Sequence, residues 1–176
     1  MTPPDSSTRF LDTTGFSLIE IHLAGGNRSP LPLARYCAGM SQENVEIARR
    51  TCEAAWRRPK PDYDTLNALS HPDHEMFTVQ SLVEGGGYLG ARGFREWLIS
   101  WGEMFGEDWE SHVEEARAID TERVLITGWI KVRGVGGGVP VEQRFWVVMT
   151  LRDGKVARSA VYTDREQALE AAGLHE

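Results

Sequence analysis

The sequence predicts an α+β fold in which the helices come mainly before a largely antiparallel sheet. Three helical segments and one strand occupy residues 45–105, and four strand-like segments follow one another between residues 109 and 163. Short polar or glycine-rich turns join these four, which leaves no room for the crossover helices that parallel strands need. A last helical segment begins at residue 165.

The helices are predicted from apolar residues at helical spacing. An amphipathic helix is expected to follow the N-cap Ser41 and to continue to about Arg58. Asp62 is expected to cap a short second helix over residues 63–70, and a third helix covers residues 93–105. The third helix places a row of apolar side chains on one face: Phe94, Trp97, Leu98, Trp101 and Phe105.

The strands are predicted where β-favouring residues alternate with polar ones between turn signals. They cover residues 75–83, 109–120, 123–134, 139–151 and 155–163. Between the last two, Asp153-Gly154 is a strong hairpin signal because a tight turn needs positive φ. Asp164 is then expected to cap a final helix that closes on Gly173.

Residues 1–39 differ in composition from the rest, being rich in Thr, Ser, Pro and Gly, with one alternating piece at residues 16–23 that suits a strand. Met40 directly precedes the expected N-cap and resembles a natural translation start. We therefore expect residues 1–39 to be a leader, either dispensable or contributing a strand. Residues 40–174 are expected to form a single domain.

Composition excludes several classes of function. The formal net charge is −7, with 26 acidic and 19 basic residues, so polyphosphate backbones should repel the chain. The sequence shows neither an apolar run of membrane-spanning length nor a basic start followed by an apolar stretch. Its two cysteines, Cys37 and Cys52, lack metal-like spacing and suit a reducing compartment. We expect a cytoplasmic protein that binds neither nucleic acid nor membrane.

A glycine pattern before the third helix raises the question of a nucleotide cofactor. Gly85, Gly87 and Gly90 spell G-x-G-x-x-G, as in a dinucleotide-binding turn. That turn needs a parallel sheet, which hairpin-connected strands do not build. The acidic residues about twenty positions on, Asp108 and Glu110, precede or open a strand, whereas the ribose-binding acid ends one. We interpret the glycines as a bend leading into a helix and expect no cofactor.

Several segments resemble the nuclear transport factor 2-like superfamily, specifically its SnoaL-like, polyketide-cyclase-like bacterial branch. The segments are residues 40–56, 71–79, 87–98, 141–156 and 161–174. The resemblance implies a cone, in which a curved sheet wraps around three helices and leaves a pocket for a small molecule, and a homodimer through the sheet. It does not imply one activity, because members include isomerases, cyclases, dehydratases, epoxide hydrolases and non-catalytic binders.

The catalytic positions of ketosteroid isomerase do not carry over to this chain. The base, the tyrosine and the second aspartate of that family fall on Thr78, Cys52 and Val147. A threonine cannot remove a carbon-bound proton at neutral pH, and a valine donates no hydrogen bond. The acid-base candidates that remain are His74, on the first strand, and Tyr162, near the end of the last. The alternative for His74 is a histidine at the pocket rim or in a cap. The alternative for Tyr162 is a core residue whose hydroxyl reaches solvent.

An apolar pocket is expected between the helices and the sheet. Its predicted lining is Cys52, Trp56, Met76, Thr78, Trp97, Trp101, Phe145, Val147 and Met149. A metal site is not expected, because His74 and its neighbour Glu75 would point to opposite faces of a strand. Two hypotheses stay open. One is a cofactor-independent cyclase, isomerase or hydrolase acting on a small apolar or aromatic metabolite, and the other is a non-catalytic binding or accessory dimeric domain.

The outer face of the sheet is the expected dimer interface. Trp129 and Trp146 would form an apolar patch there if both face outward. Glu142 and Arg144 have the parity opposite to Val147, so they should also lie on the outer face, either paired across the interface or solvated.

Overall fold

The computed structural model describes residues 33–78, 81, 86–106, 109–133 and 139–174. The chain divides into two units, residues 1–30 and residues 31–176, and all described residues belong to the second. The predicted leader at residues 1–39 lies mostly outside the described part and stays a prediction.

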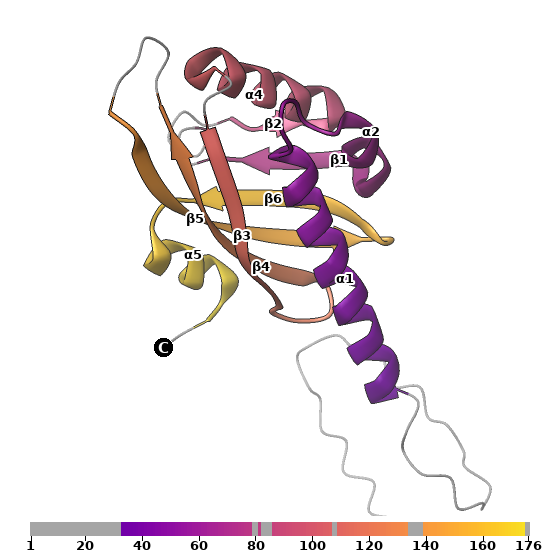
Figure 1. The fold of residues 1–176 in the computed structure, drawn as a ribbon. Coiled ribbons are helices and arrows are strands. Elements are labelled where there is room, and N and C mark those ends of the chain that lie inside the picture. The colour runs from indigo at the N-terminus through magenta and orange to yellow at the C-terminus, as the bar shows by residue number, and fades with distance from the viewer. Residues whose placement is uncertain (1–32, 79–80, 82–85, 107–108, 134–138, 175–176) are drawn as a thin grey trace, which may run out of the picture. The chain divides into compact units, whose positions relative to one another are not determined.

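The described residues form four helices and six strands, which confirms the predicted α+β class (Figure 1). In chain order they are α1 (Leu33–Ala55), α2 (Tyr63–Leu69), β1 (Ser70–Phe77), β2 (Tyr88–Leu89), α4 (Gly90–Phe105), β3 (Trp109–Ala118), β4 (Arg123–Val132), β5 (Val141–Arg152), β6 (Lys155–Tyr162) and α5 (Arg165–Ala172).

The six strands form one open sheet in the order β2-β1-β6-β5-β4-β3, so that β1 lies between β2 and β6 (Figure 1). Strands β3 to β6 pair antiparallel with their sequence neighbours, as hairpins require, whereas β1 pairs with β6 in parallel. The β1–β6 register shifts between Ser70 and Glu75. Pro72, which has no N–H to donate, falls within that irregular stretch.

Helices α1, α2 and α4 pack on one face of the sheet and α5 on the other. Side chains alternate between the two faces along β4 and β5, so these strands contribute to one hydrophobic core on each face. Ile126 and Val147 join the core that contains residues of α1, whereas Leu125 and Val148 join the core that contains Ala172 of α5. We call the side with α1 the inner face and the side with α5 the outer face.

The largest errors in the predicted boundaries are in α1 and β1. Helix α1 begins at Leu33, so Ser41 lies inside it instead of capping it. The sequence offers no proline between Pro32 and Pro59, and therefore nothing forces the helix to start as late as residue 41. Strand β1 covers Ser70–Phe77 instead of residues 75–83, because α2 ends at Leu69 and the chain pairs with β6 at once.

The caps predicted at Asp62 and Asp164 agree with the structure, and so does the entry into a helix at Gly90. The Asp62 carboxylate accepts from the Thr65 N–H at the start of α2, and Asp164 accepts from the Gln167 N–H at the start of α5. Helix α4 starts at Gly90, whose φ of 65° is a conformation that favours glycine. The glycine pattern therefore carries the chain into a helix, while Gly85 and Asp108 lie outside the described residues.

Candidate functional site

A cavity of about 90 Å³ lies between the helices and the inner face of the sheet. This volume is several times what one water molecule needs. Its lining comes from α1, α4 and the strands β1, β4, β5 and β6. The lining residues are Thr51, Cys52, Ala55, Trp56, Met76, Phe94, Trp97, Trp101, Ile130, Gln143, Phe145, Val147, Met149, Ser159, Val161 and Thr163.

Aromatic rings dominate one wall of this cavity, with Trp56 at their centre. Its ring meets those of Trp97 and Trp101 edge to face, at centroid distances of 5.4 and 5.2 Å. Phe145 lies 6.4 Å away, from the sheet side. Edge-to-face aromatic pairs add to the stability that burial itself provides. The rings therefore make this wall of the cavity apolar.

The polar groups of the lining are few, and none of the described lining residues carries a charged side chain. Gln143 and Thr163 are exposed to solvent, whereas Thr51 and Cys52 are buried. The Thr51 hydroxyl donates to the carbonyl of Ile47 one helical turn back, at 2.8 Å. Burial raises the pKa of the Cys52 thiol to about 12, so it is neutral and only a weak donor.

The remaining buried polar group of the lining, Ser159 on β6, contacts a histidine. Its Oγ lies 3.0 Å from Nε2 of His74 on β1. His74 is fully buried, and its ring is perpendicular to that of Phe94 at a centroid distance of 5.3 Å. Burial lowers its pKa to about 4, so the imidazole is neutral at pH 7. Its other nitrogen, Nδ1, has no hydrogen-bond partner among the described residues.

Most residues predicted for the pocket line this cavity. Those that do are Cys52, Trp56, Met76, Trp97, Trp101, Phe145, Val147 and Met149. Thr78 does not, because β1 ends at Phe77. The Thr78 N–H instead donates to Ser81 Oγ at 2.7 Å, and the Ser81 N–H donates to Thr78 Oγ1 at 3.2 Å.

The two acid-base candidates lie in different places. His74 is not at the rim; it is buried behind the cavity and reaches it through Ser159. Tyr162 is not at the pocket mouth. Side chains alternate along β6, so that Val161 lines the cavity and Tyr162 packs against the outer core beside α5. The two candidate side chains are thus on opposite faces of the sheet.

Sequence reasoning missed some of the lining. Gln143 has the same strand parity as Phe145 and Val147, so an extension of that alternation would have found it. Ser159 required the register of β6, in which Ser159 pairs with Met149 of β5 and Met76 of β1, both predicted pocket residues. A single serine within a strand gave no other signal.

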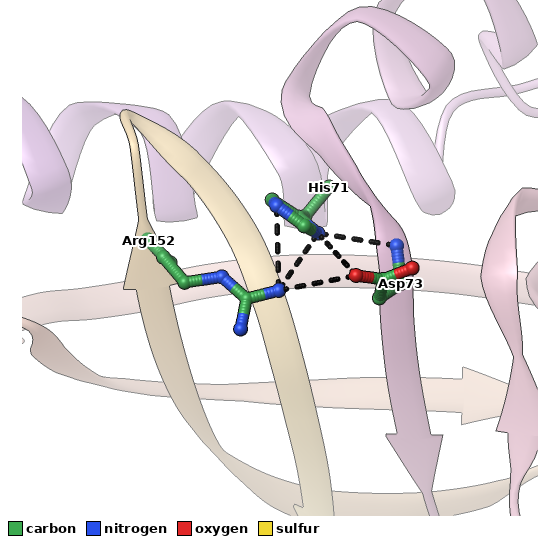
Figure 2. A network of polar contacts seen from close by, with 3 residues as sticks. All are labelled: His71, Asp73 and Arg152. Carbon is green, nitrogen blue, oxygen red and sulfur yellow. Dashed lines mark hydrogen bonds and ion pairs between the residues drawn. The ribbon is translucent and has the colours of Figure 1, made fainter.

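A metal site is not formed by the polar residues of β1. Figure 2 shows that His71 and Asp73 meet Arg152, at the end of β5, in a network at the surface. One guanidinium nitrogen of Arg152 lies 3.1 Å from His71 Nδ1 and 3.4 Å from Asp73 Oδ2. Arg152 is thus a partner of both side chains, while His74 is buried on the inner face. Over the described part of the chain, no three His, Cys, Asp or Glu side chains converge.

The outer face carries both tryptophans named for the dimer, and both are half-buried. Trp146 packs against the core beside α5, and Trp129 lies near His112 at a centroid distance of 6.1 Å. Arg144 makes a bidentate ion pair with Glu114 of the same chain, at 2.8 and 3.3 Å. Arg144 therefore has a partner within its own sheet. No described helix is long and apolar enough to cross a membrane.

Comparison with known proteins finds solved structures with a similar fold. No protein-family model and no curated protein matches the chain. Among solved structures, a nuclear transport factor 2-like protein from Burkholderia xenovorans matches with 26% identity and a TM-score of 0.56, over 75% of this chain and 97% of that one. TerC, crystallised with polyporic acid, matches with 23% identity and a TM-score of 0.59, over 74% and 98%.

A third structure covers more of the chain. It is a protein from a Jannaschia species named as a SnoaL-like polyketide cyclase, with 18% identity and a TM-score of 0.60 over 86% of this chain and 100% of that one. The order of helices and strands and these likenesses agree with the motifs of the sequence. The chain therefore has the nuclear transport factor 2-like fold in the form that SnoaL-like proteins share.

Proposed function

We propose that this protein binds a small apolar or aromatic molecule in the cavity between its helices and its sheet. The observation that carries the proposal is the lining itself, which combines tryptophan and phenylalanine rings with aliphatic and sulfur side chains and no described charge. Ligand pockets are mostly apolar with a few polar anchors, and an apolar cavity of comparable character in another protein binds benzene. TerC, which has a similar fold, was crystallised with a small organic molecule.

The test is calorimetric titration with a panel of one-ring and two-ring aromatic compounds. Ala55 lines the cavity at the end of α1, so Ala55→Leu places a larger side chain in the space that a ligand would use. Glu53→Leu adds an apolar side chain at an exposed position of the same helix and serves as the matched control. We expect the wild type and Glu53→Leu to bind and Ala55→Leu to lose affinity at least about tenfold, which is about 1.4 kcal/mol. Equal affinity for all three would place the ligand elsewhere.

A second candidate function is a cofactor-independent cyclase, isomerase or hydrolase acting on the same class of molecule. The observation that favours it is the contact between His74 and the cavity-lining Ser159. We rank it below simple binding because a histidine with a pKa of about 4 is a weak base at pH 7, whereas efficient general bases titrate near the working pH. Turnover that is lost in His74→Phe while binding persists would reverse this order.

A homodimer through the outer face of the sheet is part of the proposal. Trp129 and Trp146 supply partly exposed aromatic surface there. Light scattering at micromolar concentration should give twice the mass of one chain, and Trp129→Lys should reduce it. A monomeric mass for the wild type would remove the dimer. The cytoplasmic location also stays a proposal, based on cysteine usage, and fractionation of cells tests it.

A further inference from the structure

The contact between His74 and Ser159 leaves the second ring nitrogen of the histidine without a partner among the residues that the structure describes and places the serine hydroxyl at the cavity wall. Both side chains are at least nine-tenths buried, and they meet at 3.0 Å. Beyond that contact, His74 Nδ1 has no partner among the described residues. Ser159 lines the cavity, and no acceptor for its hydroxyl proton other than His74 is found in the described part of the chain.

The neutral imidazole can make this contact in two ways. With its proton on Nδ1, Nε2 accepts from the Ser159 hydroxyl, and a buried N–H on Nδ1 is left unpaired. With its proton on Nε2, that N–H donates to Ser159 Oγ, and Nδ1 is left as an unpaired acceptor. A buried donor without a partner is rarer in proteins than an under-used acceptor. In the second arrangement, the Ser159 O–H is itself an unpaired donor unless an acceptor enters the cavity. With an acceptor bound, the group left unpaired is Nδ1, an acceptor, whereas the first arrangement keeps its unpaired N–H. An acceptor in the cavity therefore favours the second arrangement, with Nε2–H donating to the serine.

The second arrangement has a consequence for the cavity. When Ser159 Oγ accepts from His74, its own O–H proton is free to point at another acceptor. The second buried hydroxyl of the lining, that of Thr51, is already used on the carbonyl of Ile47. In this arrangement Ser159 is a hydrogen-bond donor at the wall of an apolar cavity. Its O–H needs an acceptor there, because a buried donor without one costs free energy.

We propose that the cavity takes an aromatic ligand carrying one acceptor oxygen, such as a ketone carbonyl, which receives the hydrogen bond of the Ser159 hydroxyl while His74 holds that serine in place. This inference rests on the proposed function and specifies its ligand class. Ser159 is a binding residue in this scheme, and His74, which is shielded behind it, is a positioning residue.

The test compares two probes of the same shape, acetophenone and α-methylstyrene, in which a CH₂ group replaces the carbonyl oxygen. One net hydrogen bond is worth about 0.5–1.5 kcal/mol, so the wild type should bind the ketone about 2–10 times more tightly than the alkene. Ser159→Ala should lose the preference for the ketone or reverse it, because the carbonyl oxygen would then be buried without a hydrogen bond. Thr163→Val, which removes an exposed hydroxyl of the same lining, should keep the preference of the wild type.

The outcomes separate the two proposals. If the wild type binds neither probe, both the proposed function and this inference are overturned. If it binds both equally, or if Ser159→Ala keeps the preference for the ketone, the cavity still binds aromatic molecules but the serine does not select them. An independent readout is the long-range ¹H–¹⁵N spectrum at saturating acetophenone, which reports the protonated ring nitrogen of His74. We expect Nε2 in the complex, and a proton on Nδ1 there would contradict the arrangement.

Discussion

The buried His74 makes the stability of the protein depend on pH in a predictable window. The pKa of this histidine falls from 6.5 to about 4 on folding because burial disfavours the imidazolium. Between these values the unfolded chain binds a proton that the native state does not. Stability is therefore full above about pH 6.5 and decreases as the pH falls towards 4. Since each pKa unit is worth about 1.4 kcal/mol, the loss is on the order of 3 kcal/mol.

The assay is urea unfolding at several pH values from 7 to 4, for the wild type and His74→Phe. The phenylalanine keeps an aromatic ring against Phe94 and removes the titration. Carboxylates also titrate near the acid end, but they are present in both proteins, so the difference between the two curves isolates the histidine. His112→Gln removes an exposed histidine and should follow the wild type.

The reasoning is refuted if the wild type and His74→Phe lose stability in parallel over this range. Should the variant fail to fold, an NMR titration of the wild type decides the same question. The His74 ring signals should stay those of a neutral imidazole down to about pH 5. A midpoint near 6.5 would show that the ring is accessible to water.

Two further predictions concern the sheet and its outer helix. A Cβ at Gly128 would collide with the backbone carbonyl oxygen of His112 and come within 2.7 Å of the Phe145 ring. Gly128→Ala should therefore destabilise the fold by about 2 kcal/mol or more in urea unfolding. An unchanged urea midpoint would contradict the close approach of β3 to β4 at this glycine. Asp164→Ala should lower the free energy of unfolding by about 1 kcal/mol, because α5 loses its N-cap. Asp164→Asn can still accept a hydrogen bond and should recover most of that stability. Equal losses in both variants would argue against the cap.

The sequence was informative wherever a local rule decides the structure. Capping carboxylates, hairpin signals and the alternation of side chains predicted the helices after residue 62 and the four consecutive strands. The same alternation along β5 placed Phe145, Val147 and Met149 in the cavity. These features depend on neighbours in sequence, and that is why they could be predicted from a single chain.

The parts that failed depend on pairing between distant segments. The end of the β1–β6 pairing decides whether Thr78 lies in the cavity. The register of β6 decides on which face of the sheet Tyr162 lies. The His74–Ser159 contact joins residues 85 positions apart. No periodicity in the sequence predicts this contact, because the two side chains meet only when β1 and β6 lie side by side.

The most direct test of the ligand-binding cavity uses the six tryptophans of the chain as reporters. Trp56, Trp97 and Trp101 line the cavity, whereas Trp129 and Trp146 lie on the outer face. An NMR titration with acetophenone should move the indole N–H signals of the first three and leave those of the last two in place. Shifts confined to the outer-face tryptophans, or no shifts at saturating acetophenone, would contradict binding in the cavity.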